Sequence, residues 1–492
     1  MAFETPIHDP DTLSGGIHDA PEIRGLFGIC GTMVSPNRPG RGGLPATGED
    51  ASRSPFETDG DKIIFSSAFR ALADKTQVHD RVEPRGHHRN RLTHSMEVSR
   101  VGRSLGMAVA AGICNGDEAR MRDISHAVAA ACLAHDVGNP PFGHLGEEAV
   151  SAFFRETDHG RFVADRAAEE SPRLAAELGM HEGNAQGWRM ITRTAGWRQG
   201  AGLALTAATL GAFLKYPFML DDETVARSRG ASGKIPARKY GVFGADAAVL
   251  EQVAALTGMD RLSPTRFARH PLAYLTEAAD DICYLIVDME DGVGLGYLSE
   301  AEMVELVAPL LDDAELAEAR GIETRAERLH YLRSRAIRAL VRAAADAFSE
   351  NRRGVMSGRL GETGSGPLPD KPAGLMRFSR AGDALERIRA VSVERIYRAP
   401  AMQAARDSQF EALQSFLFLV FERAILAEDG PDPVREGARS DLAAMLGLDP
   451  GDPCGPGGRP IGHAGIARRI LDRMTLLPER HVLEVVARWS GR

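Results

Sequence analysis

The 492-residue sequence lacks the features that would place it among membrane, secreted or disulfide-rich proteins. Its five cysteines are odd in number and never spaced as CxxC, which excludes a disulfide framework and a zinc ribbon. The longest apolar runs, at 127–134 and 416–421, are far shorter than the ~20 residues that span a bilayer. The first twenty residues lack the basic start and the apolar stretch of a signal peptide. We therefore expect a cytoplasmic protein that contacts no membrane.

Several common catalytic motifs are missing as well. The stretch most similar to a phosphate-binding P-loop, SRGASGKIP, has Ser228 in place of the first glycine and Ile235 in place of serine or threonine. GxSxG, HExxH and GxGxxG do not occur in a fitting context. These absences exclude P-loop, serine-hydrolase, zinc-protease and Rossmann enzymes. A net charge of −9 also argues against a protein that coats nucleic acid through its overall field.

What is present is a globular composition with a helical pattern. The chain is 43% hydrophobic and 26% charged, which are ordinary proportions, and its length predicts two or three domains. In 119–135, apolar side chains recur at three- and four-residue steps before Gly138, which predicts a helix. Residues 274–290, 301–317 and 408–427 show the same period, and alternating strand patterns are nearly absent. We therefore predict an all-α fold.

Stretches rich in glycine and proline suggest where the chain divides. They lie at 351–375 and 449–464, between helical patterns, which is typical of loops or linkers. Residues 1–52 are rich in Gly, Pro, Ser and Asp and show no sustained period. We predict four parts: a mobile N-terminal arm (1–52), a helical core (53–350), a Gly/Pro-rich linker or loop (351–375) and a C-terminal helical region (376–492).

A His-Asp dipeptide marks the first candidate site. It occurs four times, but only His135-Asp136 ends a long apolar helix, where the two side chains can be held rigidly. The other copies lie in the N-terminal arm or a charged stretch, where we expect solvated loop residues. An imidazole and a carboxylate suit a borderline divalent ion. Further ligands should come from other helices, and His94 and Asp280 are placed to supply them.

Acidic residues within an apolar helical pattern support a cation site. Asp280, Tyr284 and Asp288 share one helical face by i, i+4, i+8 spacing, while Asp281 points about 100° away. Acids inside an apolar pattern cost free energy unless a cation neutralises them. On spacing alone, surface acids on an amphipathic helix stay an open alternative.

These residues resemble the HD superfamily of metal phosphohydrolases, whose signature is H…HD…D. Within it they are similar to the dGTP triphosphohydrolase (dGTPase) family in its long-chain bacterial form. Six blocks within 54–292 follow the family's order and rough spacing: SPFETDGDKIIFSSAFRALADKTQV, NRLTHSMEVSRVGRSL, LAHDVGNPPFGHLGEEAV, HEGNAQGWRM, LTAATLGAFLKYP and RHPLAYLTEAADDICYLIVDMEDG. The resemblance implies an HD-type core that hydrolyses dGTP, or other dNTPs, to deoxynucleoside and tripolyphosphate.

The resemblance also implies roles for individual residues. The catalytic pair would be His144 and Glu147, which lie at i, i+3 and so share a helix face. Asn139 stands where many HD phosphohydrolases carry a second histidine; long-chain dGTPases also show Asn there, and its presence leaves more of the proton transfer to His144. The ligands of a divalent ion, Mn²⁺ or Mg²⁺ with Fe²⁺ or Co²⁺ as alternatives, would be His94, His135, Asp136 and Asp280.

Substrate contacts follow from the same blocks. Only six of 59 basic residues are lysine, so each stands out, and a compact ammonium suits a crowded polyphosphate. Lys215 and Lys239 are our candidates for phosphate contacts, with surface lysines as the alternative. Tyr284 resembles the residue that packs under deoxyribose and excludes a 2′-hydroxyl. The other candidates for substrate contact are Gln77, which resembles the residue that meets the nucleoside, and His181 and Glu182, near the phosphates.

The sequence is compatible with more than one kind of partner besides the substrate. Residues 81–103 hold six Arg and three His against two Glu, and this stretch could attract the triphosphate, border a nucleic-acid groove or form a solvated face. The family resemblance implies a homo-oligomer, a hexamer or tetramer, and allows single-stranded DNA as a partner. Two alternatives to the dNTP hydrolase stay open: an HD phosphohydrolase for another nucleotide, and an HD scaffold that senses nucleotides or binds single-stranded DNA.

Overall fold

The computed structural model of the protein describes residues 33–39, 53–76, 89–195, 202–228, 239–362, 373–448 and 462–490. Helices dominate these residues, and their only strands are β1 (Arg261–Ser263) and β2 (Arg266–Phe267), which pair antiparallel. The predicted all-α fold is confirmed. None of the described helices combines the length and the apolar character that a membrane span requires.

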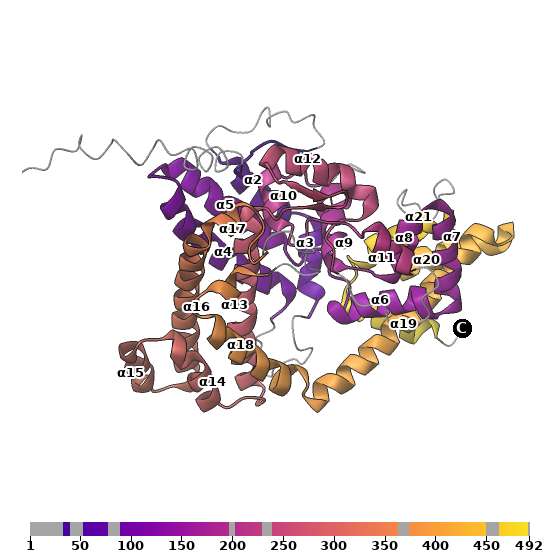
Figure 1. Cartoon of the computed structure of the whole chain (residues 1–492). Helices are drawn as coiled ribbons and strands as arrows, with labels where there is room; N and C mark the ends of the chain where they lie inside the picture. The colour runs from indigo at the N-terminus through magenta and orange to yellow at the C-terminus, as the bar shows by residue number, and fades with distance from the viewer. Residues whose placement is uncertain are drawn as a thin grey trace, which may run out of the picture.

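One group of helices surrounds the long helix α13 and encloses the larger hydrophobic core (Figure 1). Within it, α4 packs along α5, and α13 contacts both. The helices of this group are α2 (Pro55–Ile64), α3 (Ser67–Arg70), α4 (Arg91–Ile113), α5 (Glu118–Ala134), α9 (Gly183–Arg189), α10 (Ala207–Phe213), α12 (Ala247–Thr257), α13 (Pro271–Gly294), α14 (Glu300–Val307), α15 (Asp313–Gly321), α16 (Arg325–Glu350), α17 (Arg352–Met356) and α18 (Gly382–Val391). Short turns of 3-10 or π type are η2 (Ala71–Asp74), η3 (Met190–Thr194), η4 (Gly244–Asp246), η5 (Ala308–Leu310), η6 (Leu375–Phe378) and η7 (Ser392–Tyr397).

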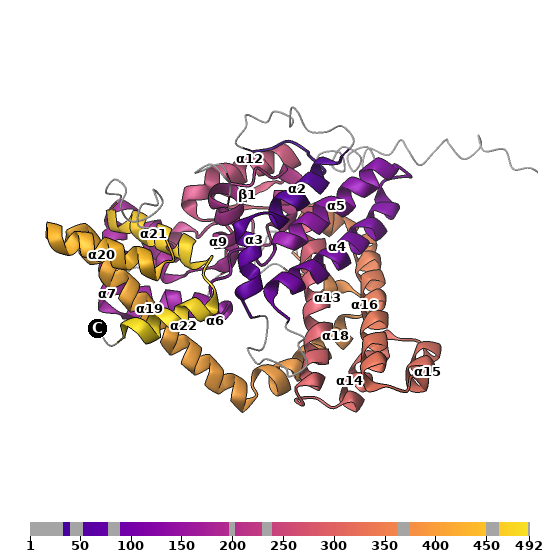
Figure 2. The same ribbon diagram turned by 180° about the vertical axis from the view of Figure 1, so that it is seen from behind.

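A second group combines helices from the middle and the end of the chain. Its core contains Phe153 and Phe154 together with Phe416, Phe421 and Trp489. Figures 1 and 2 show α19 running diagonally from the side of α18 to this group. The helices of the group are α6 (His144–Glu156), α7 (Asp158–Glu170), α8 (Pro172–Gly179), α19 (Pro400–Asp429), α20 (Asp432–Met445), α21 (Gly462–Met474) and α22 (Glu479–Trp489). The short helix α11 (Asp222–Ser228) packs against α8.

Two glycines of α4, Gly102 and Gly106, lie directly against α5. A Cβ atom at Gly102 would lie 2.4 Å from Sγ of Cys132, so a larger residue here would require the Cys132 side chain or the helix to shift. At its start, α4 is capped by the Asn90 side chain, which accepts a hydrogen bond from the amide of Thr93. The cap and the close crossing together fix His94, in the first turn of α4, against the end of α5.

Most of the predicted helices are present, and one is broken. The helices predicted at 119–135, 274–290 and 408–427 correspond to α5, α13 and α19. The single helix predicted over 301–317 is wrong, because η5 separates α14 from α15. Pro309 in η5 has no amide hydrogen to donate, and Asp312 caps the new helix.

The four predicted parts of the chain stay a prediction. Of the arm, residues 33–39 are described, and Met33 and Arg38 are buried. Part of the predicted linker forms α17. The hydrophobic cores join segments across that linker: η6 and α18 pack in the larger core, and α6–α8 pack with the C-terminal helices.

Candidate functional site

Three side chains from three helices converge on one point in the larger core. His94 comes from the first turn of α4, His135 from the end of α5 and Asp280 from the middle of α13. Asp280 Oδ1 lies 3.2 Å from Nε2 of His94 and 3.4 Å from Nε2 of His135. One ligand atom of each residue lies within 4.8 Å of the others, so this group could hold a metal ion.

The ring of His135 is oriented by its own helix. Its Nδ1–H donates to the carbonyl oxygen of Cys132 at 2.7 Å, which directs Nε2 toward the group. Burial lowers the pKa of this histidine, but the charges of Asp136 and Asp280 outweigh burial and raise it to about 9. The two carboxylates therefore attract positive charge to this point, which fits a cation site.

Asp136 adds a fourth potential ligand. Its Oδ1 accepts hydrogen bonds from Arg91, at 3.0 Å, and from the side-chain amide of Asn139, at 2.6 Å. Its Oδ2 is buried and has no hydrogen-bond partner among the described residues. A buried carboxylate oxygen without a donor is costly, and a bound cation would satisfy it. Two imidazoles and two carboxylates suit a divalent transition metal or Mg²⁺.

His144 and Glu147 form a second pair at the start of α6. Nδ1 of His144 lies 3.1 Å from Oε2 of Glu147, and 81% of the His144 side chain is exposed. The other carboxylate oxygen accepts from the amide of Gly183 at 2.9 Å. Burial would raise the pKa of Glu147, but the bond to His144 and the charge of Lys239 lower it to about 2. The carboxylate is therefore ionised at neutral pH and holds the imidazole by Nδ1.

The remaining candidates of this block gather around the same carboxylate. Nζ of Lys239 lies 3.2 Å from Glu147 and 2.8 Å from Glu182. Burial, with the nearby charge of Glu147, raises the pKa of Glu182. His181 is buried, its ring nitrogens have no hydrogen-bond partner within the described residues, and burial lowers its pKa to about 4. This histidine is therefore neutral at pH 7.

Lys215, the second candidate for phosphate contact, also lies beside a buried acid. Its Nζ is 3.1 Å from Glu277, which accepts a hydrogen bond from Arg269 at 2.8 Å as well. Burial lowers the pKa of Lys215, but the charge of Glu277 outweighs burial and raises it. Both candidate lysines are thus paired with carboxylates in this structure. Gln77 lies outside the described residues.

Tyr284 packs against a residue that the sequence did not suggest. Its ring stacks on Tyr397 with centroids 5.8 Å apart, and the Tyr397 hydroxyl donates to Oδ2 of Asp288 at 2.5 Å. Burial raises the pKa of Asp288 to about 8. Asp288 therefore binds Tyr397 and does not join the metal group, although it shares a helix face with Asp280. Tyr397 lies 109 residues after Asp288, and no local pattern connects the two.

The described end of the 81–103 stretch is not a free basic patch. Arg89 pairs with Glu290 at 2.8 Å and with Asp291 at 2.6 Å, and Arg91 pairs with Asp136. Arg91 could have been found from the sequence, because it precedes His94 by three residues on the same helix and so lies beside it. Acids on α13 and at the end of α5 neutralise these two arginines.

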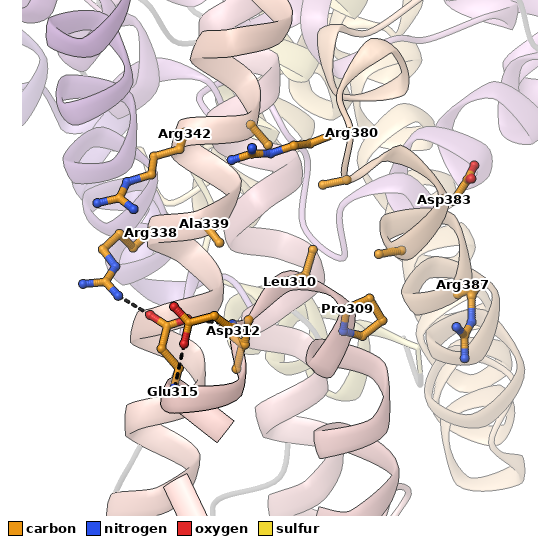
Figure 3. Close-up of a pocket in the computed structure, with 14 residues that line it drawn as sticks. Pro309, Leu310, Asp312, Glu315, Arg338, Ala339, Arg342, Arg380, Asp383 and Arg387 are labelled. Atoms are coloured by element: carbon orange, nitrogen blue, oxygen red, sulfur yellow. Dashed lines mark hydrogen bonds and ion pairs between the residues drawn. The ribbon is translucent and has the colours of Figure 1, made fainter. Parts of the chain in front are cut away.

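A separate pocket of about 540 Å³ lies between α16, the η5–α15 segment and α18 (Figure 3). None of the predicted site residues lines it. Figure 3 shows Arg338 directed to Glu315, with which it pairs. Four arginines line the pocket together with three acids: Arg338, Arg342, Arg380, Arg387, Asp312, Glu315 and Asp383. Its charges largely balance.

Comparison with known proteins agrees with this site. Residues 91–190, which include three of the four potential metal ligands, match the HD domain family. A deoxyguanosinetriphosphate triphosphohydrolase-like protein of Pseudomonas aeruginosa is 34% identical over 455 residues, 90% of this chain and 95% of the relative. Proteins of the same name from Synechocystis sp. and Listeria monocytogenes are 36% and 30% identical, covering 74% and 80% of this chain and 80% and 83% of their own lengths. The chain therefore belongs to the deoxyguanosinetriphosphate triphosphohydrolase-like family of HD-domain phosphohydrolases.

Proposed function

We propose that this protein is a metal-dependent dNTP triphosphohydrolase that cleaves dGTP and related dNTPs to deoxynucleoside and intact tripolyphosphate. One observation carries the proposal: a single short segment, residues 135–147, joins the His/Asp group to the His144–Glu147 pair. The proposed cation site and the proposed proton-transfer pair are therefore joined by a short stretch of chain. The names of the curated relatives support the same reaction.

The metal would be held by His94, His135, Asp136 and Asp280. This donor set accepts Mn²⁺ or Mg²⁺, and Fe²⁺ or Co²⁺ would also fit. When bound, such an ion lowers the pKa of a coordinated water and polarises a phosphoryl oxygen.

His144 would transfer a proton to the leaving group. Hydrolysis at the α-phosphorus releases the 5′-oxygen of the deoxynucleoside, and an alkoxide leaves poorly without a proton. Because Glu147 binds Nδ1 of His144, Nε2 is the atom left to hold and deliver that proton. The exposed imidazole is accessible to a substrate bound from solvent.

The other predicted residues would position the substrate. Lys215 and Lys239 would contact the polyphosphate. Each ammonium group would then lie between a phosphate oxygen and the carboxylate with which it pairs. His181 and Glu182 would lie near the phosphates, and Gln77 would meet the nucleoside. The Tyr284–Tyr397 stack offers a flat aromatic surface for deoxyribose, where a 2′-hydroxyl would clash.

A product assay tests the proposal. Purified protein is incubated with each dNTP and with GTP in Mn²⁺, and the products are separated by ion exchange. We expect deoxynucleoside and tripolyphosphate from dNTPs and no turnover of GTP, with activity lost in His135→Ala and kept in the surface control His330→Ala. Nucleoside mono- or diphosphate products would contradict the proposal and identify another HD phosphohydrolase.

The other partners predicted from the sequence belong to this proposal. They are a hexameric or tetrameric homo-oligomer and single-stranded DNA, in a cytoplasmic enzyme. The pairing of Arg89 and Arg91 with acids leaves the exposed Arg100 and Arg103 as the described cations of the 81–103 stretch that could contact DNA.

A further inference from the structure

The first residue of α22 contacts the loop that precedes α6. Glu479 is buried, and each of its carboxylate oxygens accepts hydrogen bonds from residues far away in the sequence. Oε1 accepts from the amide of Phe142 at 2.9 Å. Oε2 accepts from the amide of Thr76 at 3.2 Å and from its hydroxyl at 2.7 Å. One side chain of the C-terminal region thus links the segment after η2 in the larger group to the loop before α6 in the second group.

The amide that Glu479 binds belongs to a strained residue. Phe142 has a φ of +65°, a left-handed conformation that is unfavourable for an aromatic residue, and Gly143 follows with a φ of +58°. Gly143 is the N-cap of α6, so this pair of residues sets the direction in which His144 enters the helix. Such a conformation persists only where surrounding contacts hold it. The contact from Glu479 is one of them.

A second contact from the α21–α22 turn supports the other end of the same loop. Lys75 is buried, and its Nζ donates to the carbonyl oxygens of Thr475, at 2.5 Å, and of Asn139, at 2.6 Å. The side chain of Asn139 in turn donates to Asp136. The loop between Asp136 and His144 is therefore held at residue 139 through Lys75 and at residue 142 through Glu479.

We propose that Glu479 is a positioning residue for His144. By binding the Phe142 amide, Glu479 holds the backbone before α6 in the conformation that orients the His144 imidazole. The inference rests on the proposed function. It makes α22 a part of the catalytic apparatus, although none of its residues needs to touch the substrate.

Three variants test this role. In Glu479→Ala, both acceptor oxygens are lost, and we expect kcat to fall by about 10- to 100-fold, the scale of an ångström-sized misplacement, with KM for dNTP unchanged. Glu479→Gln keeps one acceptor oxygen and should retain more of the kcat. The matched control is Glu484→Gln, an exposed residue on the same helix, which should behave as the wild type.

Two further measurements separate positioning from folding. The buried Val482, Val485 and Trp489 keep α22 docked without Glu479, so the thermal midpoint should stay well above the assay temperature. Hydrogen–deuterium exchange of the 139–147 peptide should be faster in Glu479→Ala than in wild type or Glu484→Gln. If Glu479→Ala does not fold, the thermal midpoint and the exchange rate are measured on Glu479→Gln instead.

The outcomes distinguish this inference from the proposed function. A wild-type kcat in both Glu479 variants overturns the positioning role, as does a rise in KM with kcat unchanged. If the wild-type protein hydrolyses no dNTP, the proposed function fails, and peptide exchange alone decides whether Glu479 anchors the loop. Unchanged exchange in that case overturns the anchoring too.

Discussion

Nε2 of His94 lies 3.2 Å from Oδ1 of Asp280, although 186 residues separate the two in the sequence. With His135, they bring a carboxylate and two imidazoles from three helices to one point, where His94 is buried and the Asp280 side chain is 31% exposed. Partial burial makes an uncompensated carboxylate unfavourable, so this point favours a positive charge beside Asp280.

Asp280→Asn should weaken metal binding. The substitution keeps the shape of the side chain but removes the charge that attracts the cation. We expect Mn²⁺ affinity to fall by more than the ~10–100-fold that loss of an outer contact to a ligand costs, and turnover to fall with it. Titration calorimetry with Mn²⁺ measures the affinity. Asp432→Asn, on the exposed surface, is the control and should bind Mn²⁺ as the wild type does.

Glu147→Gln should lower turnover without loss of metal. The Gln side chain is neutral, so His144 loses the negative charge that holds its Nδ1. We expect kcat to fall by about 10²–10⁴-fold. The neighbouring Glu148→Gln is a matched control, because Glu148 is exposed and its ion pair within the described part of the chain is with the exposed Arg406. Mn²⁺ affinity should be the same in both variants. Equal kcat values for the two would contradict a role for Glu147.

The sequence predicted those parts of the molecule that depend on local pattern or on the family's ordered blocks. The helical period identified α5, α13 and α19, and the blocks led to His94, His135 and Asp280, which the structure brings together. Even the break between α14 and α15 had a visible signal in Pro309.

Contacts between distant segments could not be predicted in this way. Tyr397 reaches Asp288 only once η7 has packed on α13, and Glu479 reaches Phe142 only once the C-terminal helices have packed around α6. Such pairs have no fixed spacing in the chain, since tertiary packing alone decides which helix faces meet. The pairing of Lys215 and Lys239 with acids was missed for the same reason.

Asp288 should make the protein less stable as the pH rises. Burial raises its folded-state pKa to about 8 from an ordinary value of 3.8, so the folded protein keeps a proton that the unfolded chain releases. Between those values, each pH unit should cost about 1.4 kcal/mol of unfolding free energy from this group. Asp288→Asn keeps an acceptor for Tyr397 but cannot ionise. Denaturant unfolding from pH 5 to pH 8 should therefore show that the unfolding free energy falls less steeply with pH in the variant than in the wild type. Identical slopes would refute the raised pKa of Asp288.

Gly102→Ala should disturb both the fold and the metal group. Its new Cβ would lie 2.4 Å from Sγ of Cys132 and 3.3 Å from Cγ1 of Val128, so we expect α4 and α5 to move apart, and overpacking of this kind costs about 1–3 kcal/mol. Gly112→Ala, on the same helix with no atom within 4 Å of its new Cβ, should instead stabilise the protein by about 0.5–1 kcal/mol. Because His94 and His135 lie on the two helices that separate, Mn²⁺ affinity should fall only in Gly102→Ala. Denaturant unfolding and Mn²⁺ titration of both variants measure the two effects, and equal stability of the variants would show that the helices do not cross as closely as described.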